Sequence, residues 1–278
     1  MWSTWGVIIK FMQLDALQMV FYTTLFSLPP ILIIAFLKSG TVRENLAGIS
    51  LNYKILLCLA LSLLLNNFFY FAAFNRTSIA ISVFTHYTAP LFVALLAPLM
   101  LAEKFDRRLI FPLAIASLGL AAILAPGWHA DTNTKDLLGA LCGTASGLAY
   151  AFTLIFAKRL TSELKILALV FGQSLFIILC LLPFIFFNPD PGLPLSGWLW
   201  LMLMGLTHCT LAPLLYISGL THLKAQHTAI IGYIEPLAAV CLGLLLAHES
   251  PSSSIWFGGG AIIISGVIIT RLKKRTCI

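Results

Sequence analysis

Charged side chains are scarce in this chain of 278 residues. Only 10% of the residues are charged and 60% are apolar, against about 25% charged and roughly 45–50% apolar in soluble domains. A soluble core could not hide repeated charge-free runs such as residues 167–187. That run reaches about the 20 residues that a helix needs to cross a hydrocarbon layer of ~30 Å. The composition therefore predicts a polytopic membrane protein and excludes a soluble globular domain.

Several chemical signatures are also missing. The six cysteines show no CxxC spacing and lie mostly within apolar runs, which argues against a disulfide framework and a metal site. No GxxxxGK[ST], HExxH or GxSxG motif occurs, so ATP-driven transport and enzymatic catalysis have little support. No secretory signal peptide is visible at the N-terminus. We therefore expect no cofactor, no metal and no catalytic residue.

The apolar runs predict a series of membrane-spanning helices. Full spans are expected at residues 15–37, 54–74, 78–101, 108–125, 137–157, 166–187, 197–218, 225–247 and 254–270. Helices are favoured over a closed β-barrel because the runs are continuous rather than alternating. A stub at residues 2–9 precedes them and covers about 13 Å at helical rise. It is either a short first helix or the end of one that begins upstream of Met1, and we favour the second reading.

The distribution of basic residues predicts the orientation. With a cytoplasmic N-terminus, only Lys10, Arg76 and Lys135 of the 17 Lys and Arg residues fall on the outer side. Cytoplasmic loops of membrane proteins carry such an excess of Lys and Arg. Both termini are therefore expected in the cytoplasm. Topology also explains the net charge of +7, so no nucleic-acid partner is expected.

The chain repeats itself without gaps at a shift of 146 residues. The shift pairs Tyr70 with Tyr216, Ser82 with Thr228, Tyr87 with Tyr233, Pro90 with Pro236, Glu103 with Glu249 and Phe111 with Phe257. With the stub counted, each copy holds five helices, and an odd number inverts the second copy. Inverted repeats around a midmembrane site are typical of secondary transporters.

The expected fold class is therefore an all-α integral membrane bundle of ten helices, the first apparently truncated, built from two inverted five-helix repeats. We place the first repeat at residues 1–125 and the second at residues 137–270. A connecting loop at residues 126–136 and a basic cytoplasmic tail at residues 271–278 complete the chain.

Two related segments carry a family resemblance. Residues 80–90 (AISVFTHYTAP) and 99–104 (LMLAEK), with residues 227–236 (HTAIIGYIEP) and 244–249 (LLLAHE), resemble the paired signature of the drug/metabolite transporter superfamily, EamA type. The resemblance implies a ten-helix fold with a central cavity between the repeats, in a bacterial inner membrane, and export of small organic solutes. One departure is visible: Phe21-Tyr22 is followed by Thr23-Thr24, where many relatives place an Arg.

Polar side chains within the spans mark the expected pathway, because each costs a few kcal/mol in hydrocarbon unless it faces protein or water. The candidates for a substrate or coupling cavity are Glu235, His86, Asn66, Asn67, Tyr87, Tyr150, His208 and Tyr233. Ser146 and Thr153 are further polar residues of the same apolar spans. Asn66 and Asn67 point about 100° apart on a helix, so we expect at most one of them to face the cavity squarely.

Glu235 is the sharpest candidate, because it lies about halfway along the span 225–247. A carboxyl group there could bind and release a proton or balance a cationic substrate. The alternative is a protonated structural residue bonded to a neighbouring helix.

Pro90 and Pro236 are predicted helix kinks. Each proline leaves the carbonyl group four residues earlier without its helical partner, which frees the carbonyl groups of His86 and Gly232 for a substrate. Alternatively, both prolines only set bends that let the bundle rock.

The function predicted from these features is secondary transport of small organic metabolites or drug-like compounds, including amino-acid-like solutes, by alternating access. Export with proton coupling is the leading form. An uncoupled facilitator or uptake permease is the alternative, followed by a flippase for lipid-linked substrates. The expected partners are a small-molecule substrate, the lipid bilayer and protons. Both a monomer and a homodimer remain open.

Overall fold

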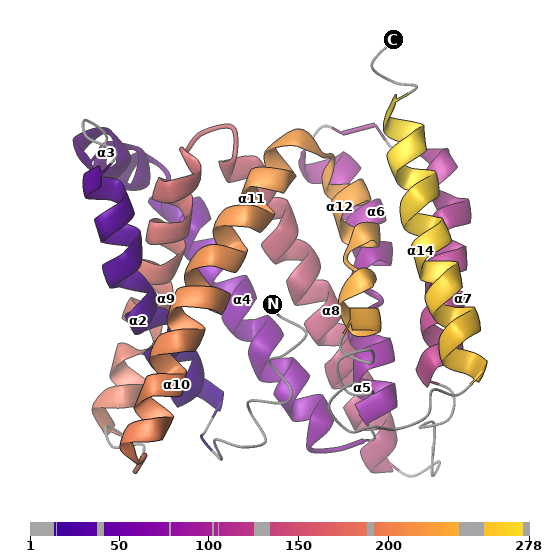
Figure 1. Cartoon of the computed structure of the whole chain (residues 1–278), viewed down its shortest axis with the longest axis horizontal. Helices are drawn as coiled ribbons and strands as arrows, with labels where there is room; N and C mark the ends of the chain where they lie inside the picture. Colours follow the sequence, from indigo (N-terminus) through magenta and orange to yellow (C-terminus); the bar gives the residue numbers. More distant parts are fainter. Residues whose placement is uncertain are drawn as a thin grey trace. The chain divides into compact units, whose positions relative to one another are not determined.

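The computed structural model describes residues 14, 16–37, 42–77, 79–101, 103–104, 106–124, 134–187, 192–238 and 253–274 (Figure 1). These residues are helical apart from turns and short connections. Several predicted features lie outside the described residues: the stub at residues 2–9, most of the connecting loop, and the end of the span 225–247 with Glu249 beyond it.

Residues 234–238 are helical, and the other described helices follow one another along the chain. They are α2 (Ala16–Leu37), α3 (Val42–Leu51), α4 (Tyr53–Phe74), α5 (Ile79–His86), α6 (Ala89–Met100), η2 (Arg107–Leu109), α7 (Ile110–Leu124), α8 (Thr134–Leu160), α9 (Ile166–Phe187), α10 (Leu195–Leu206), the π-helical turn η4 (Thr207–Leu211), α11 (Ala212–His222), α12 (Ala225–Ile231) and α14 (Ser253–Lys274).

The described helices fit a membrane. Six helical segments of the described chain are long and apolar enough to cross a bilayer: Leu17–Phe36, Tyr53–Phe74, Ile81–Met100, Leu137–Leu160, Ile166–Phe187 and Leu195–His222. Large apolar side chains remain exposed on them, as at Leu99 (81%) and Phe187 (80%). Water would penalise such exposure and lipid does not. The predicted all-α integral membrane class is confirmed.

Helix α3 was not predicted. It is a short helix between two spans and carries Arg43 and Glu44 in its first turn, so a hydropathy search passes over it. The Asn52 side chain donates to the Gly48 carbonyl oxygen at 3.1 Å and closes the helix. Gly48 lets α3 approach the turn before α9, since a Cβ atom there would lie 2.8 Å from Leu164 Cδ2.

The described chain forms two compact units. Unit 1 contains residues 1–64 and 156–222, and unit 2 contains residues 65–155 and 223–278. Each unit therefore draws on both sequence repeats. The first repeat passes from unit 1 to unit 2 after residue 64, whereas the second repeat begins in unit 2, continues in unit 1 at residues 156–222 and ends in unit 2.

Unit 1 is organised around α2, which packs against α9 and α10 (Figure 1). Met19, Phe21, Ile177, Leu201 and Met204 belong to its buried apolar core. A Cβ atom at Gly205 would lie 2.8 Å from the Thr23 carbonyl oxygen, so glycine allows α10 and α2 to touch through their backbones.

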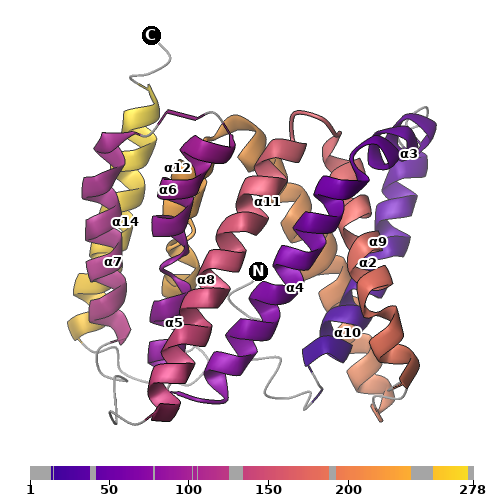
Figure 2. The same ribbon diagram turned by 180° about the vertical axis from the view of Figure 1, so that it is seen from behind.

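Unit 2 contains a tightly packed helix pair. Helices α7 and α14 lie side by side in both views (Figures 1 and 2). Glycine again permits the approach, since a Cβ atom at Gly119 would lie 2.7 Å from the Gly258 carbonyl oxygen. The Ser265 hydroxyl donates to the Pro112 carbonyl oxygen at 2.7 Å. Helix α12 packs against α6, α7 and α14.

Two of the predicted spans are broken rather than bent. Helix α5 ends at His86, Tyr87 and Thr88 form a turn, and α6 begins at Ala89 with Pro90 in its first turn. Helix α12 likewise ends at Ile231, and the helical residues 234–238 follow a turn and include Pro236. A proline lacks the N–H group that a helix interior needs, whereas the first turn does not need it. Each proline therefore starts a new helix here instead of kinking a continuous one.

A row of glycines brings α8 against the first break. Gly139, Gly143 and Gly147 recur every four residues and so share one helix face. A Cβ atom at Gly147 would lie 2.6 Å from the His86 carbonyl oxygen. The backbone of α8 therefore rests directly on the end of α5, as small residues allow between membrane helices.

Candidate functional site

Seven of the eight predicted cavity residues belong to unit 2, and His208 alone belongs to unit 1. The residues of unit 2 come from α4, α8 and the two helix breaks. The polar residues scattered along the sequence are thus largely gathered within one compact unit.

A hydrogen-bonded chain of three side chains holds His86 in place. His86 Nδ1 lies 2.6 Å from Ser146 Oγ on α8, and Ser146 donates to Asn66 Oδ1 on α4 at 3.2 Å. All three residues are buried. A buried polar group without a partner is costly, so this chain joins α4, α5 and α8 and fixes the imidazole ring.

Three tyrosine rings border the imidazole ring of His86. Its centroid lies 4.3 Å from that of Tyr70, 5.2 Å from that of Tyr87 and 5.6 Å from that of Tyr150. The first pair is tilted, at 31°, and the second is edge-on, at 89°. The histidine therefore lies in an aromatic cluster rather than on a plain aliphatic face.

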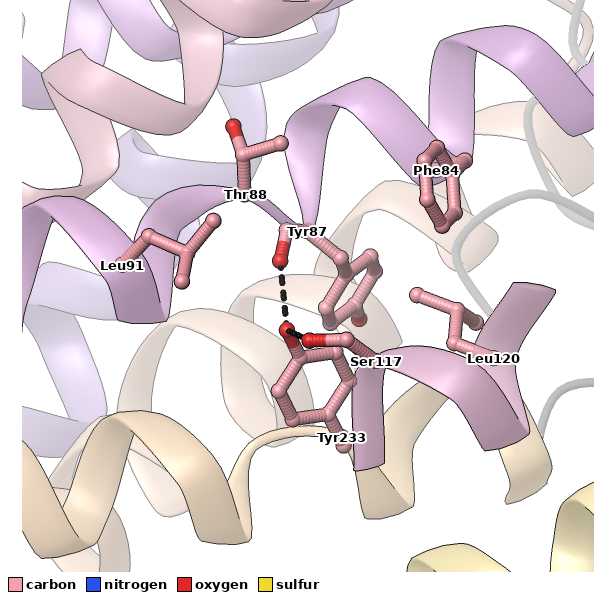
Figure 3. Close-up of a pocket in the computed structure, with 7 residues that line it drawn as sticks. All are labelled: Phe84, Tyr87, Thr88, Leu91, Ser117, Leu120 and Tyr233. Carbon is pink, nitrogen blue, oxygen red and sulfur yellow. Dashed lines mark hydrogen bonds between the residues drawn. The ribbon is translucent and has the colours of Figure 1, made fainter. Parts of the chain in front are cut away.

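Tyr233 joins the two broken helices. Its hydroxyl group donates to the Tyr87 carbonyl oxygen at 2.9 Å and lies 3.0 Å from Ser117 Oγ on α7 (Figure 3). A carbonyl oxygen only accepts, so the single tyrosine proton goes to Tyr87 and the Ser117 hydroxyl donates to Tyr233. Tyr87 and Tyr233 are exactly one repeat apart, at 146 positions. Equivalent residues of the two sequence copies thus meet in direct contact.

A small cavity lies beside this contact. It measures about 170 Å³ and is lined by Phe84, Tyr87, Thr88, Leu91, Ser117, Leu120 and Tyr233 (Figure 3). Ligand pockets usually measure ~300–1,000 Å³. The cavity is therefore too small for most metabolites.

Glu235 lies in the helical turn after the second break and is half-buried. Its carboxyl group interacts with the Tyr87 hydroxyl group and electrostatically with Tyr70. Tyr87 therefore packs against His86 with its ring edge and interacts with Glu235 through its hydroxyl group. The acid of the second copy and the histidine of the first copy are connected through one tyrosine.

The carbonyl groups released by the prolines are not open acceptors. The Gly232 carbonyl oxygen accepts from the Glu235 N–H group at 3.0 Å, and the His86 carbonyl oxygen is packed against Gly147 of α8. Our expectation that both would face a substrate is therefore corrected. Each break closes a tight turn, and the turn or a neighbouring helix covers the carbonyl group.

Asn67 and His208 have other surroundings. Asn67 is half-buried, and no hydrogen bond to the described cluster residues is found for it, whereas its neighbour Asn66 is buried in the His86 chain. His208 is buried in the π-helical turn of unit 1, where Nδ1 lies 2.8 Å from Thr207 Oγ1. Such turns interrupt a helix and are frequent at functional sites.

Three residues of the cluster were not among the predicted cavity residues. Ser146 and Tyr70 were visible in the sequence as polar or aromatic residues of apolar spans, but their contact with His86 was not. Ser117 gave no signal, because it is a lone serine in the apolar helix α7. Only the rotation of α7 against the second break gives it a partner.

The repeated Glu103 has a structural role. Its carboxylate accepts from the Ala225 N–H group at 3.1 Å and from Gln226 Nε2 at 3.5 Å, at the start of α12. The first N–H groups of a helix lack partners within the helix, and a carboxylate there also interacts favourably with the helix dipole. The glutamate that closes the first sequence signature therefore caps a helix of the second copy.

Comparisons with known proteins agree with this architecture. The sequence model of the EamA-like transporter family matches residues 1–125 and 137–271. A crystal structure with 17% sequence identity superposes with a TM-score of 0.78 over 99% of this chain and 94% of that chain. At this identity, the likeness shows the fold alone.

Three curated relatives are similar in sequence. An uncharacterized transporter of Bacillus subtilis, YxxF, is 26% identical over 77% of this chain and 68% of the relative. An uncharacterized transporter of Archaeoglobus fulgidus is 28% identical over 72% and 70%. The pseudopaline exporter CntI of Pseudomonas aeruginosa is 24% identical over 74% and 70%.

These matches cover both predicted sequence repeats and agree with the drug/metabolite transporter resemblance found in the sequence. The protein is a multi-pass membrane transporter with a small-molecule substrate. The chain belongs to the EamA-like transporter family.

Proposed function

We propose that this protein is a secondary transporter that exports small organic solutes across a bacterial inner membrane by alternating access, with Glu235 coupling transport to protons. The observation that carries the proposal is the position of Glu235: a half-buried carboxyl group at a helix break, which interacts with Tyr87 of the other sequence copy.

The two broken helices support alternating access. Discontinuous helices at the repeat interface are the usual place for substrate and ion sites in secondary transporters. Here the breaks meet through the Tyr233 hydroxyl group and the Tyr87 carbonyl oxygen. A helix that ends and restarts can change its angle without breaking a continuous ladder of hydrogen bonds. The small cavity beside Tyr233 gives space for such a movement.

The surroundings of Glu235 support coupling. The Tyr87 hydroxyl group can donate to the carboxylate after the proton has left, and Tyr70 lies within electrostatic range. His86, Tyr150 and Tyr233 are the other titratable groups of the described cluster. A proton on Glu235 removes the charge that would hold a cationic or polar solute. Proton binding from one side then favours release of the solute.

The direction of transport is proposed from two observations. The similar protein CntI is named as an exporter, and the family resemblance of the sequence signature also favours export. We propose cytoplasmic termini from the excess of Lys and Arg on one side, as the positive-inside rule implies.

The test uses purified protein in proteoliposomes loaded with the twenty standard amino acids and 2-phenylethylamine, with efflux followed by mass spectrometry. We expect a proton gradient to drive efflux of part of this panel, and Glu235→Gln to lose the dependence on the gradient. Glu163→Gln is the control, since Glu163 is an exposed carboxylate in a turn of unit 1.

Each other outcome has a defined meaning. Equal, pH-insensitive rates for the wild type and Glu235→Gln would refute coupling and leave an uncoupled facilitator. Movement of labelled long-chain lipids, without movement of the panel, would replace the proposal by a flippase.

A further inference from the structure

We infer that His86 is a substrate-binding residue whose free ring nitrogen selects solutes with an N–H-bearing ammonium group. The inference rests on the proposed function, because it assumes that unit 2 binds the transported solute. It concerns the chemical class of that solute, which the coupling role of Glu235 leaves open.

The hydrogen-bonded chain fixes which nitrogen of His86 carries the proton. Ser146 has one hydroxyl proton and donates it to Asn66 Oδ1. Its oxygen therefore accepts from His86, so Nδ1 carries a proton. In a neutral imidazole, Nε2 is then the acceptor. No described residue hydrogen-bonds Nε2, which leaves its lone pair for a donor group of a ligand.

The walls of this position suit a cation. The rings of Tyr70, Tyr87 and Tyr150 surround the imidazole with centroid distances of 4.3, 5.2 and 5.6 Å. A tyrosine ring attracts a cation through its quadrupole, and more strongly when the cation is desolvated. Tyr87 also connects the position to the carboxyl group of Glu235, which supplies a negative charge one ring away.

The position does not suit an anion. The Lys and Arg residues of unit 2 whose side chains the structure describes lie near helix ends and are exposed or half-buried. They are Arg76, Lys104, Arg107, Arg108, Lys135, Lys224 and Arg271. None lies in the aromatic cluster. A carboxylate solute would therefore meet tyrosine π faces and an acceptor nitrogen without a compensating cation.

The Nε2 acceptor of His86 distinguishes ammonium groups that carry an N–H from those that do not. A primary or secondary ammonium group can donate an N–H bond to His86 Nε2 and still face the tyrosine rings. A quaternary ammonium group has the same charge but cannot donate. Aromatic rings alone would bind both, so the preference between them reports on His86.

The experiment measures binding of three probes to the purified full-length protein by isothermal titration calorimetry. The probes are 2-phenylethylamine, its N,N,N-trimethyl derivative and 3-phenylpropanoate, which differ in donor capacity and charge. We expect the primary amine to bind about tenfold or more tightly than the trimethyl compound, as for a hydrogen bond to a charged group. We expect 3-phenylpropanoate to bind most weakly.

Two substitutions test whether His86 causes the preference. His86→Phe keeps a ring against Tyr70 and removes the acceptor, so both cations should bind with the weaker affinity. His86→Asn keeps a side-chain acceptor and should retain part of the preference. The control is His222→Phe, because His222 is exposed at the end of α11 and bonds only within its own helix. The melting temperature of each ligand-free variant reports whether it is folded.

The inference is overturned if the trimethyl compound binds as tightly as the primary amine, if the carboxylate binds best, or if no amine binds. It is also overturned if folded His86→Phe keeps the preference. Its failure is separable from that of the proposed function. Proton-driven, Glu235-dependent efflux of an anionic or neutral solute would overturn this inference and leave the transport proposal standing.

Discussion

The two helix breaks of unit 2 occupy equivalent places in the sequence repeat, and a comparison of their tyrosines shows what the repeat preserves. The Tyr233 hydroxyl group bonds the Tyr87 carbonyl oxygen and Ser117. The Tyr87 hydroxyl group instead interacts with the side chain of Glu235. Tyr233 therefore connects structural elements of the unit, whereas Tyr87 interacts with an ionisable side chain.

The difference follows from the residues that the repeat pairs with one another. The 146-residue shift pairs Glu235 with Ala89, Ser117 with Ile263 and His86 with Gly232. Each polar group is thus present in one copy only. The proline and tyrosine that shape the break are kept in both. The residues that shape the break therefore occur in both copies, whereas each ionisable side chain occurs in one copy only.

A carboxyl group placed in the first copy should not be tolerated. Ala89 is only 2% exposed, so Ala89→Glu would bury an additional acid against the packed end of α5. We expect a cost of several kcal/mol from the unpaired acid and a further 1–3 kcal/mol from overpacking. The yield of monodisperse protein in size-exclusion chromatography measures the effect. Ala89→Ser is the control, and a well-folded Ala89→Glu would contradict the packing described at this break.

A methyl group at the contact between α8 and the first break should destabilise the protein. In Gly147→Ala the new Cβ atom would lie 2.6 Å from a backbone oxygen, which cannot move aside as a flexible side chain can. We expect a loss of about 1–3 kcal/mol, seen as a lower melting temperature in detergent. Gly260→Ala in α14 meets no atom within 4 Å and should be neutral or stabilising. Equal melting temperatures for both variants would count against the close contact of α8 and α5.

Removal of the Tyr233 hydroxyl group should also lower stability, through lost hydrogen bonds and not through overpacking. Tyr233→Phe keeps the ring but leaves the Tyr87 carbonyl oxygen and the Ser117 hydroxyl group without this partner, at a cost of about 1–3 kcal/mol. The double variant Tyr233→Phe/Ser117→Ala should lose less stability than the sum of the two single variants, because both substitutions break the same hydrogen bond. Strictly additive losses in melting temperature would show that the bond does not form.

Much of the fold was predictable because hydropathy records the length of each span. The predicted span 166–187 has the same bounds as α9, and the predicted span 54–74 differs from α4 by one residue. Helix α3 was missed because its charged first turn lowers its hydropathy. The breaks were placed correctly by Pro90 and Pro236, but the sequence did not show that the helices stop and restart.

The site was less predictable than the fold. An ionisable or amide group in an apolar span is recognisable by itself, so Glu235, His86 and Asn66 could be named as candidates. Their partners depend on how each helix is rotated about its axis, which composition does not record. Ser117 and the cap formed by Glu103 on α12 became visible only in the structure.

The most direct test compares Tyr87→Phe with Tyr233→Phe in the same proteoliposomes, as the ratio of proton-driven to downhill efflux. We predict that Tyr87→Phe lowers this ratio about tenfold, because the Glu235 carboxylate loses its interaction with the Tyr87 hydroxyl group. Tyr233→Phe should melt earlier and keep the wild-type ratio. A wild-type ratio in Tyr87→Phe, or an equal loss in both variants, would contradict the division of roles between the two tyrosines.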